Sequence, residues 1–209
     1  MKEYYEKYWT RDSDVSVHDV TTPERKHRLL QTLNKYCKSG ETVLDLGCGG
    51  GGKFTVWVNE AGFEAIGMDI SKRAVEMAQR EYPDGNFRTL NTDGSIPAED
   101  QTFSAVWCSE VIEHILEVDD FLKEVRRVMK PGGILILTTP YHGFIKNLFI
   151  VLFKFNRHFN VSGSHIRFFD KNSLAGCFKR TGFAPLSYGG IGRIWRLYRT
   201  WFVVARREE

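Results

Sequence analysis

The chain has 209 residues, of which 42% are hydrophobic and 13% aromatic, which is enough for one domain with a substantial core. A formal net charge of +3 is too small to indicate nucleic-acid binding by itself. The four cysteines form no CxxC pair, and no run reaches the ~20 apolar residues of a membrane-spanning helix. Because the first residues also lack an apolar signal region, we expect a reduced, cytoplasmic protein.

Short apolar runs and helical patterns alternate along the first 140 residues. The patterns predict helices at 23–36, 53–62, 72–82 and 111–130, and strands at 41–47, 64–71, 87–93, 103–109 and 133–140. Ser71 is a suitable N-cap, and the Pro131-Gly132-Gly133 run is expected to end the last of these helices. This alternation at short spacing indicates βαβ units and a buried parallel sheet.

The alternation stops after Pro140. A long segment at 141–169 has a different composition, and it is followed by a predicted helix at 171–183 and strands at 184–190 and 199–207. We therefore expect a single domain, 1–209, with four parts. These are an N-terminal helical arm (1–40), a ligand-binding core (41–140), an insertion or lid (141–169), and a C-terminal helix with two strands (170–209).

The glycine-rich stretch VLDLGCGGGGKF, at 43–54, joins a predicted buried strand to a helix, which is unlike the polar surroundings of a flexible linker. Gly47, Gly49 and Gly52 match G-x-G-x-x-G, although that pattern alone is weak evidence. The loop follows the carboxyl end of a strand, where open α/β sheets bind ligands against glycine backbone. Asp45 beneath the loop suits a cationic ligand better than a pyrophosphate.

A second acidic residue, Asp69, ends the next predicted strand about 20 residues further on. A carboxylate at this position can accept hydrogen bonds from both hydroxyls of a ribose. The alternative is that Asp69 only caps the following helix. The glycine loop and the acidic residue together favour a nucleoside-containing ligand.

These residues resemble those of the class I S-adenosylmethionine-dependent methyltransferases. The matching motifs are VLDLGCGGG, GMDIS, NTDGSIPAEDQTFSAVWCSEVIEHI and VMKPGGILILTTP, in order over roughly 41–140. The resemblance implies an α/β, Rossmann-like fold with a seven-stranded, mostly parallel sheet, helices on both faces, and an antiparallel strand seven.

The resemblance also implies which residues hold S-adenosylmethionine. Gly47 and Gly49 would approach its methionine part, and Asp69 with the adjacent Ile70 would hold the ribose. The remaining expected cofactor-pocket residues are Asp93 and Gly94 beside the adenine, Ser109 after the fourth strand, and Asp45 beneath the loop.

The run CSEVIEHI places Glu110, Glu113 and His114 at a spacing that would put them on one face of the predicted helix. The alternatives to a metal site are acids that complement the helix dipole, and His114 acting as a plain base or substrate contact. The run resembles that of the ubiquinone-biosynthesis O-methyltransferases, whose eukaryotic members bind a divalent cation with these residues. It also resembles the small-RNA 3′-terminal 2′-O-methyltransferases, which add a later histidine, for which His165 is the candidate here.

The resemblance therefore implies a metal site made of Glu110, Glu113, His114 and His165, with Mg, Mn or Zn as the suitable ion. A dication that chelates both oxygens of a vicinal pair would lower the pKa of the acceptor hydroxyl. Glu113, His114 and His165 are the expected catalytic residues. His165 can equally be a plain substrate-pocket residue.

The apolar segment 143–159 carries Lys146, Lys154, Arg157 and His158 around its core. It is too short to cross a membrane, and it suits an interfacial segment in peripheral contact with lipid. The alternative is a lid over the active site that buries its own phenylalanines. The ubiquinone-pathway family has an insertion at this place that is thought to contact membrane.

The N-terminal arm carries the aromatic run YYEKYW, and in relatives such an arm closes over the cofactor and the acceptor. The alternative is a helix that only covers the core. The resemblance places Arg25 near the carboxylate of the cofactor, with Arg28 as a rival. RIWRLYR, at 193–199, is either a contact for phosphates or anionic lipid or a solvated connection.

Methyl transfer from a sulfonium needs an aligned acceptor, and an alcohol acceptor must also lose a proton to a base or near a metal. We therefore expect an S-adenosylmethionine-dependent O-methyltransferase that acts on a small-molecule hydroxyl, as in quinone pathways, with Mg as a candidate second cofactor. The alternatives are methylation of a terminal RNA ribose, methylation of a sugar or natural product, and a cofactor-binding scaffold without activity.

Overall fold

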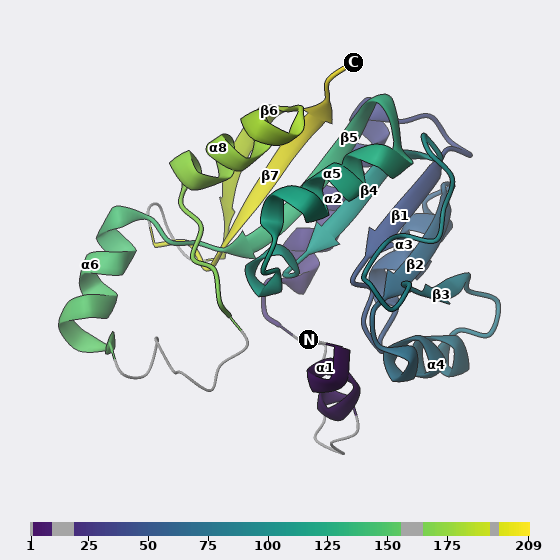
Figure 1. Cartoon of the computed structure of the whole chain (residues 1–209), viewed down its shortest axis with the longest axis horizontal. Helices are drawn as coiled ribbons and strands as arrows, with labels where there is room; N and C mark the ends of the chain where they lie inside the picture. Colours follow the sequence, from purple (N-terminus) through teal and green to yellow (C-terminus); the bar gives the residue numbers. More distant parts are fainter. Residues whose placement is uncertain (1, 10–18, 156–164, 193–196) are drawn as a thin grey trace.

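A mixed sheet of seven strands lies at the centre of the protein (Figure 1). The computed structural model describes residues 2–9, 19–155, 165–192 and 197–209. The strand order is β3-β2-β1-β4-β5-β7-β6, in which β1 to β5 are parallel and β7 is antiparallel to both of its neighbours. The strands are β1 (Thr42–Leu46), β2 (Glu64–Asp69), β3 (Phe87–Thr89), β4 (Phe103–Ser109), β5 (Met129–Pro140), β6 (Phe183–Ile191) and β7 (Thr200–Arg207). This arrangement confirms the predicted sheet, including its antiparallel strand seven.

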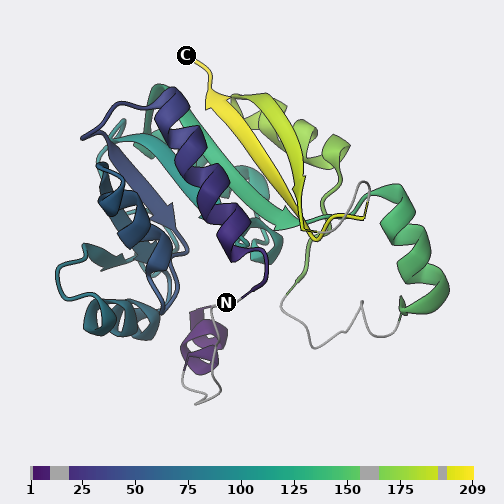
Figure 2. The ribbon, with the colours of Figure 1, turned by 180° about the vertical axis from the view of Figure 1, so that it is seen from behind.

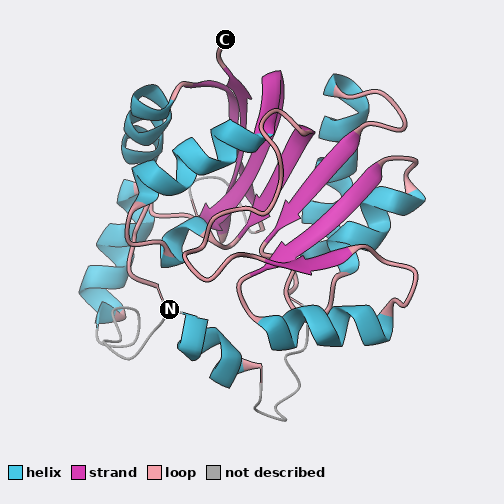
Figure 3. Cartoon of the chain, turned by 45° about the vertical axis from the view of Figure 1, so that its right-hand side comes forward, coloured by secondary structure: helices cyan, strands magenta, loops and turns pink. Residues whose placement is uncertain are grey.

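Helices flank the sheet on both faces (Figure 3). Helices α2 and α3 cover the face seen in Figure 2, and α5 and α8 cover the face seen in Figure 1. The helices are α1 (Lys2–Tyr8), α2 (Thr22–Tyr36), α3 (Lys53–Glu60), α4 (Lys72–Glu81), the short 3-10 helix η1 (Ile112–His114), α5 (Val118–Val128), α6 (Phe144–Phe153) and α8 (Lys171–Thr181).

Alternate side chains of the central strands supply two separate cores. On β1, Val43 packs with the cluster under α2 and α3, while Leu44 packs with the cluster under α5 and α8. On β4, Trp107 and Cys108 divide in the same way, and all four side chains are fully buried. Because both faces are covered, these strands have nearly continuous apolar sequences, as expected for parallel strands in an α/β fold.

The helix predicted at 111–130 is wrong as one continuous element. Glu110 has a left-handed φ of 55°, and Ile115 is extended, so only η1 and the later α5 are helical. Pro131-Gly132-Gly133 also does not end this helix. The helix stops at Val128, and the three residues form an irregular part of β5 where its pairing with β4 shifts register.

Helix α6 extends away from the sheet rather than packing onto it (Figures 1 and 2). Phe144, Phe149 and Phe153 are 80%, 49% and 69% exposed, and Ile150 is the buried residue of this helix. The expectation that a lid would bury its own phenylalanines is therefore wrong for α6. Predicted features at 156–159, with Arg157 and His158, and at 193–196 lie outside the described residues.

Candidate active site

The glycine loop begins where β1 ends and is fixed by backbone hydrogen bonds. Gly47 and Gly49 have left-handed φ values of 83° and 62°, which glycine adopts without the steric cost of a side chain. The amides of Gly47 and Cys48 both donate to the carbonyl of Met68, at 2.7 and 3.1 Å. A Cβ at Gly47 would lie 2.4 Å from Cγ2 of Val111. The loop therefore needs glycine both for its backbone and for the close approach of its neighbour.

Asp69 ends β2 directly beside this loop. Its Oδ2 accepts from the Gly49 amide at 3.0 Å, and its Oδ1 accepts from the Ser71 amide at 2.9 Å. Burial raises the pKa of this carboxyl, and the two backbone donors partly oppose that rise. Ser71, not Asp69, is the N-cap of α4, which confirms the predicted cap. A carboxylate has further lone pairs, so Asp69 can still accept hydrogen bonds from a ligand.

A cavity of about 210 Å³ lies between the glycine loop, Asp69, η1 and α1. Five of the residues that the sequence singled out for the cofactor line it, namely Gly47, Gly49, Asp69, Ile70 and Gly94. The other lining residues are Tyr5, Trp9, Leu46, Leu90, Glu110, Val111, His114, Ile115 and Phe121. Sequence reasoning missed its apolar wall, although Leu46, Leu90 and Val111 each lie close to a motif residue at the carboxyl end of a strand.

Two other residues of the expected cofactor set lie outside the lining of this cavity because they have partners elsewhere. Asp45 is buried beneath the loop, where it accepts a hydrogen bond from Thr55 Oγ1 at 2.6 Å. Burial raises the pKa of Asp45 to about 7, although the Thr55 hydrogen bonds lower it. Asp93 is exposed and accepts from the backbone and hydroxyl of Ser95.

Arg25 and Ser109 also lie outside the cavity lining and bind each other. The Arg25 guanidinium donates to Ser109 Oγ at 2.9 Å and forms an ion pair with Asp19 at 3.1 Å. Arg25 Nε is buried with no hydrogen-bond partner among the described residues. Arg28, the rival residue, is half-buried and pairs with Glu24 at 2.7 Å.

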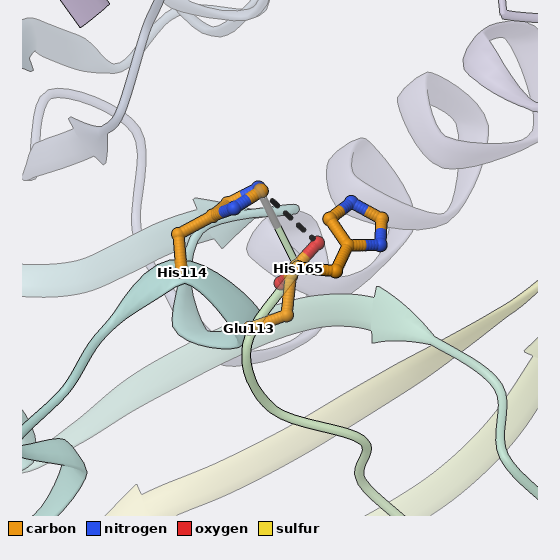
Figure 4. Close-up of side chains that lie close together, drawn as sticks. All are labelled: Glu113, His114 and His165. Carbon is orange, nitrogen blue, oxygen red and sulfur yellow. Dashed lines mark ion pairs between the residues drawn. The ribbon is translucent and has the colours of Figure 1, made fainter. Parts of the chain in front are cut away.

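The proposed metal-binding residues do not all come together. Glu113, His114 and His165 each offer one ligand atom within 4.8 Å of the others. Figure 4 shows these three side chains close together. Glu110 is not part of this group; its backbone is left-handed rather than helical, although its side chain lies near that of Glu113. Its carboxylate instead accepts from Thr200 Oγ1 on β7 at 2.5 Å. The set is therefore two imidazoles and one carboxylate.

The carboxylate of Glu113 is fully buried. Thr139 Oγ1 donates to its Oε2 at 3.1 Å, while Oε1 has no hydrogen-bond partner among the described residues and lies 3.9 Å from His114 Nε2. Burial raises the pKa of Glu113 well above its ordinary value, and the nearby Glu110 adds to this. A buried carboxylate oxygen without a donor indicates a place for a cation or a proton.

His165 is held beside this carboxylate by contacts of the residues that follow it. The amides of Ile166 and Arg167 both donate to the Glu113 carbonyl, at 3.0 and 3.1 Å. The Arg167 guanidinium donates to the carbonyls of Ile115 and Leu116, at 3.4 and 2.5 Å. The rings of His114 and His165 lie 4.9 Å apart between centroids. The segment from the insertion is thus attached directly to η1.

A family model described as "Methyltransferase domain" matches residues 18–188 of this chain. The chain belongs to this methyltransferase family. It is 30% identical over 135 residues to the human mitochondrial ubiquinone biosynthesis O-methyltransferase, an alignment that covers 59% of this chain and 36% of that protein. This methyltransferase chain therefore spans about a third of the length of that curated relative.

Solved structures share the fold of this methyltransferase. A chain from the complex of the Haloferax volcanii Trm112 methyltransferase activator with a methyltransferase has a TM-score of 0.76 at 18% identity, covering 100% of this chain and 97% of that chain. The magnesium protoporphyrin IX methyltransferase from Synechocystis, solved with bound SAH, has a TM-score of 0.71 at 20% identity, covering 90% and 84%. At these identities the likeness shows the fold alone.

Proposed function

We propose that this methyltransferase transfers a methyl group from S-adenosylmethionine to a hydroxyl of a small molecule of the quinone-pathway kind. One observation carries the proposal: a single cavity is lined by the glycine loop, by Asp69 and by His114, which adjoins Glu113 and His165. The glycine loop and Asp69 suit an adenosyl cofactor. The two histidines and Glu113 suit the deprotonation of a hydroxyl. The human relative, named a ubiquinone biosynthesis O-methyltransferase, supports the choice of acceptor.

The residues of the cavity fit the cofactor. Gly47 and Gly49 present backbone to the cavity, and the free lone pairs of Asp69 can accept from ribose hydroxyls. Glu110 lines the same cavity and offers a carboxylate to a positively charged group. When bound, S-adenosylmethionine supplies an electrophilic methyl group on a sulfonium. The protein then needs to hold the acceptor oxygen in line and remove its proton.

His114 is the residue that we expect to take this proton. Its ring lines the cavity, and its Nε2 lies 3.9 Å from Glu113 Oε1. An imidazole that accepts a proton from the acceptor hydroxyl becomes positively charged, and a neighbouring carboxylate stabilises that charge. In this proposal the charge on the protonated ring favours ionisation of Glu113, which opposes the effect of burial on its pKa, and the resulting ion pair stabilises the ring. His165, whose ring packs against that of His114, is a further contact for the acceptor.

An alternative form of the proposal has a divalent cation held by Glu113, His114 and His165, in which His114 is a ligand and does not take the proton. The buried Oε1 of Glu113 without a hydrogen-bond partner among the described residues fits such an ion. Two imidazoles with one carboxylate suit Zn or Mn better than Mg, which prefers oxygen ligands. A cation there would lower the pKa of the acceptor hydroxyl.

Transfer of a labelled methyl group to a panel of acceptors tests the proposal. Catechols and hydroquinones should be labelled, whereas matched methyl ethers without a free hydroxyl should not. Label on none of the hydroxyl acceptors, or equal label on the ethers, would contradict it. A parallel arm with a chelator, followed by Zn, Mn or Mg, tests the cation. Activity that is indifferent to the chelator and to the Glu113→Gln substitution would refute the metal part alone.

We also propose that α6 makes peripheral contact with lipid. Its exposed apolar side chains include Leu148, Leu152 and Phe153, and Lys146 and Lys154 lie beside them. Exposed apolar residues with flanking lysines suit the surface of an anionic membrane. None of the helices within the described residues combines the length and apolar character needed to span a bilayer. The cytoplasmic location stays a prediction, and the human relative is named as mitochondrial.

Flotation with liposomes that contain anionic lipid tests this contact. The Leu152→Asp substitution changes a side chain that is 63% exposed, so it should weaken flotation while leaving thermal stability unchanged. Glu64→Ala, on an exposed residue at the far end of β2, is the control. Equal flotation of the wild type and Leu152→Asp, or no flotation of either, would refute the lipid contact.

A further inference from the structure

Tyr5 in helix α1 and Trp9 directly after it cover the cavity proposed for the cofactor, and these two rings are called the aromatic roof. Tyr5 and Trp9 both line this cavity. The Trp9 indole lies directly on the glycine loop, since a Cβ at Gly49 or Gly50 would be 3.2 or 2.9 Å from its ring carbons. The Tyr5 ring packs edge-to-face on His114, with 5.8 Å between centroids. A ligand in this cavity would therefore contact both rings, beside the place where the Trp9 indole rests on the loop.

The roof is held in place by a carboxylate that contacts a different helix. Glu6 accepts a hydrogen bond from the Lys72 amide at 2.7 Å, and further bonds from Ser71 Oγ at 3.2 Å and the Arg73 amide at 3.4 Å. These amides are the first of α4, which have no partner within the helix. A carboxylate there also interacts favourably with the helix dipole. The Arg73 guanidinium donates to the Trp9 carbonyl at 2.9 Å, which fixes the other end of α1.

The contacts that hold α1 are connected to the residues proposed to hold the cofactor. Ser71 donates from its hydroxyl to Glu6 and from its amide to Asp69. Asp69 in turn accepts from the Gly49 amide, and Gly49 lies under the Trp9 ring. A continuous series of contacts thus runs from Glu6 through Ser71 and Asp69 to the glycine loop. Closure of α1 and occupation of the cavity are expected to stabilise each other.

We propose that Glu6 is a positioning residue: its contacts at the start of α4 hold α1 closed over the cavity and slow the release of the adenosyl cofactor. This inference rests on the proposed function. The physical reason is that Tyr5 and Trp9 must move before a ligand beneath them can leave. That movement first breaks the hydrogen bonds of Glu6 and the Arg73 contact. Release of the demethylated product cofactor then depends on the opening of α1.

Stopped-flow release of S-adenosylhomocysteine tests this role in the full chain. In Glu6→Ala the dissociation rate should rise about tenfold, the factor expected for the loss of charge-assisted hydrogen bonds worth about 1.4 kcal/mol. Glu6→Gln retains an acceptor oxygen without the charge and should give an intermediate rate. Glu3→Gln removes an equal charge from an exposed position on the same helix and should release at the wild-type rate. The KM for the acceptor should change less than the affinity for the cofactor.

Hydrogen exchange supplies a readout that does not depend on activity. The amides of Lys72 and Arg73 should exchange faster in Glu6→Ala than in Glu3→Gln, because they lose their acceptor. Trp9→Ala leaves Glu6 intact but removes part of the roof, and it should also speed release. If the wild type binds S-adenosylhomocysteine but Glu6→Ala releases it no faster, the role of Glu6 is refuted. If the wild type binds none, the proposed function itself fails.

Discussion

Two regions meet at the candidate active site, and they are built by different means. The region proposed to hold the cofactor, 43–69, is called the cofactor region and presents backbone and one carboxylate from the ends of two adjacent parallel strands. The acceptor region presents side chains from η1 and from a segment without regular structure that includes His165. In the first region the local sequence specifies the geometry. In the second, contacts between residues more than 50 positions apart specify it.

Because the two regions are built differently, they should tolerate substitutions differently. Close packing around Gly47 and full burial of Asp45 leave the cofactor region little space to adjust. The acceptor region has exposed residues on both sides of its buried carboxylate, including Leu116 and Ile166. Substitutions should therefore affect folding in the first region, and turnover in the second.

The largest effect is expected from Asp45 beneath the glycine loop. Its folded pKa of about 7 lies above its ordinary value of 3.8, so the folded protein retains a proton that the unfolded chain loses. The resulting stability is complete below about pH 4 and is lost as the pH rises to about 7, by up to about 4 kcal/mol. Urea unfolding at pH 5 and pH 8 should show about 3 kcal/mol of this loss in the wild type. Asp45→Asn, which cannot ionise, should show a much smaller change, and parallel pH dependence would contradict the prediction.

The next effect tests the close packing of the same region. Gly47→Ala places a Cβ 2.4 Å from Val111 Cγ2 at a φ of 83°, and should cost about 3 kcal/mol of folding stability. The additional Val111→Ala substitution should recover part of this loss. Gly132→Ala is the control, because Gly132 has a φ of 76° with nothing within 4 Å of the added Cβ. Equal losses in Gly47→Ala and Gly132→Ala would show that backbone strain, not packing, is the cause.

The cofactor region was largely predictable because its signals are local. A short apolar run, a run of glycines and a terminal acid specify a strand, a turn and a carboxylate without distant contacts. Five of the residues expected to hold the cofactor line one cavity, as their positions at strand ends suggested. Asp45 shows the limit of this prediction. The sequence places it beneath the loop, but its carboxylate accepts a hydrogen bond from Thr55 on the next helix.

The acceptor region was less predictable because no residue type marks its turning points. Neither glycine nor proline interrupts 111–117, so the helical pattern there appeared continuous. The break lies at Ile115, whose backbone is extended and whose carbonyl accepts from the distant Arg167, while the left-handed Glu110 directly precedes the predicted helix. The place of His165 came from family resemblance alone. The contact of Glu6 with α4 spans 65 or more residues and has no local signal.

A third experiment measures ligand binding in the cofactor region. Asp69→Ala removes the carboxylate proposed to hold the ribose, and should weaken S-adenosylhomocysteine binding about 100-fold, the loss of two charge-assisted hydrogen bonds. Asp84→Ala, at an exposed position after α4, is the matched control. Isothermal titration calorimetry measures both. If the affinity for S-adenosylhomocysteine is unchanged in Asp69→Ala, Asp69 does not hold the ribose.

The smallest effect is expected where the acceptor region depends on a distant contact. Arg167→Ala removes the hydrogen bonds to the carbonyls of Ile115 and Leu116 and so loosens His165 beside Glu113. Because Arg167 is exposed, stability should fall by less than about 1 kcal/mol, while kcat should fall about threefold to tenfold. Cofactor affinity should not change, and Lys179→Ala, on the exposed surface of α8, should match the wild type. Looseness at His165 alone cannot reach the glycine loop. If Arg167→Ala lowers cofactor affinity and kcat by the same factor, the two regions therefore act as one unit.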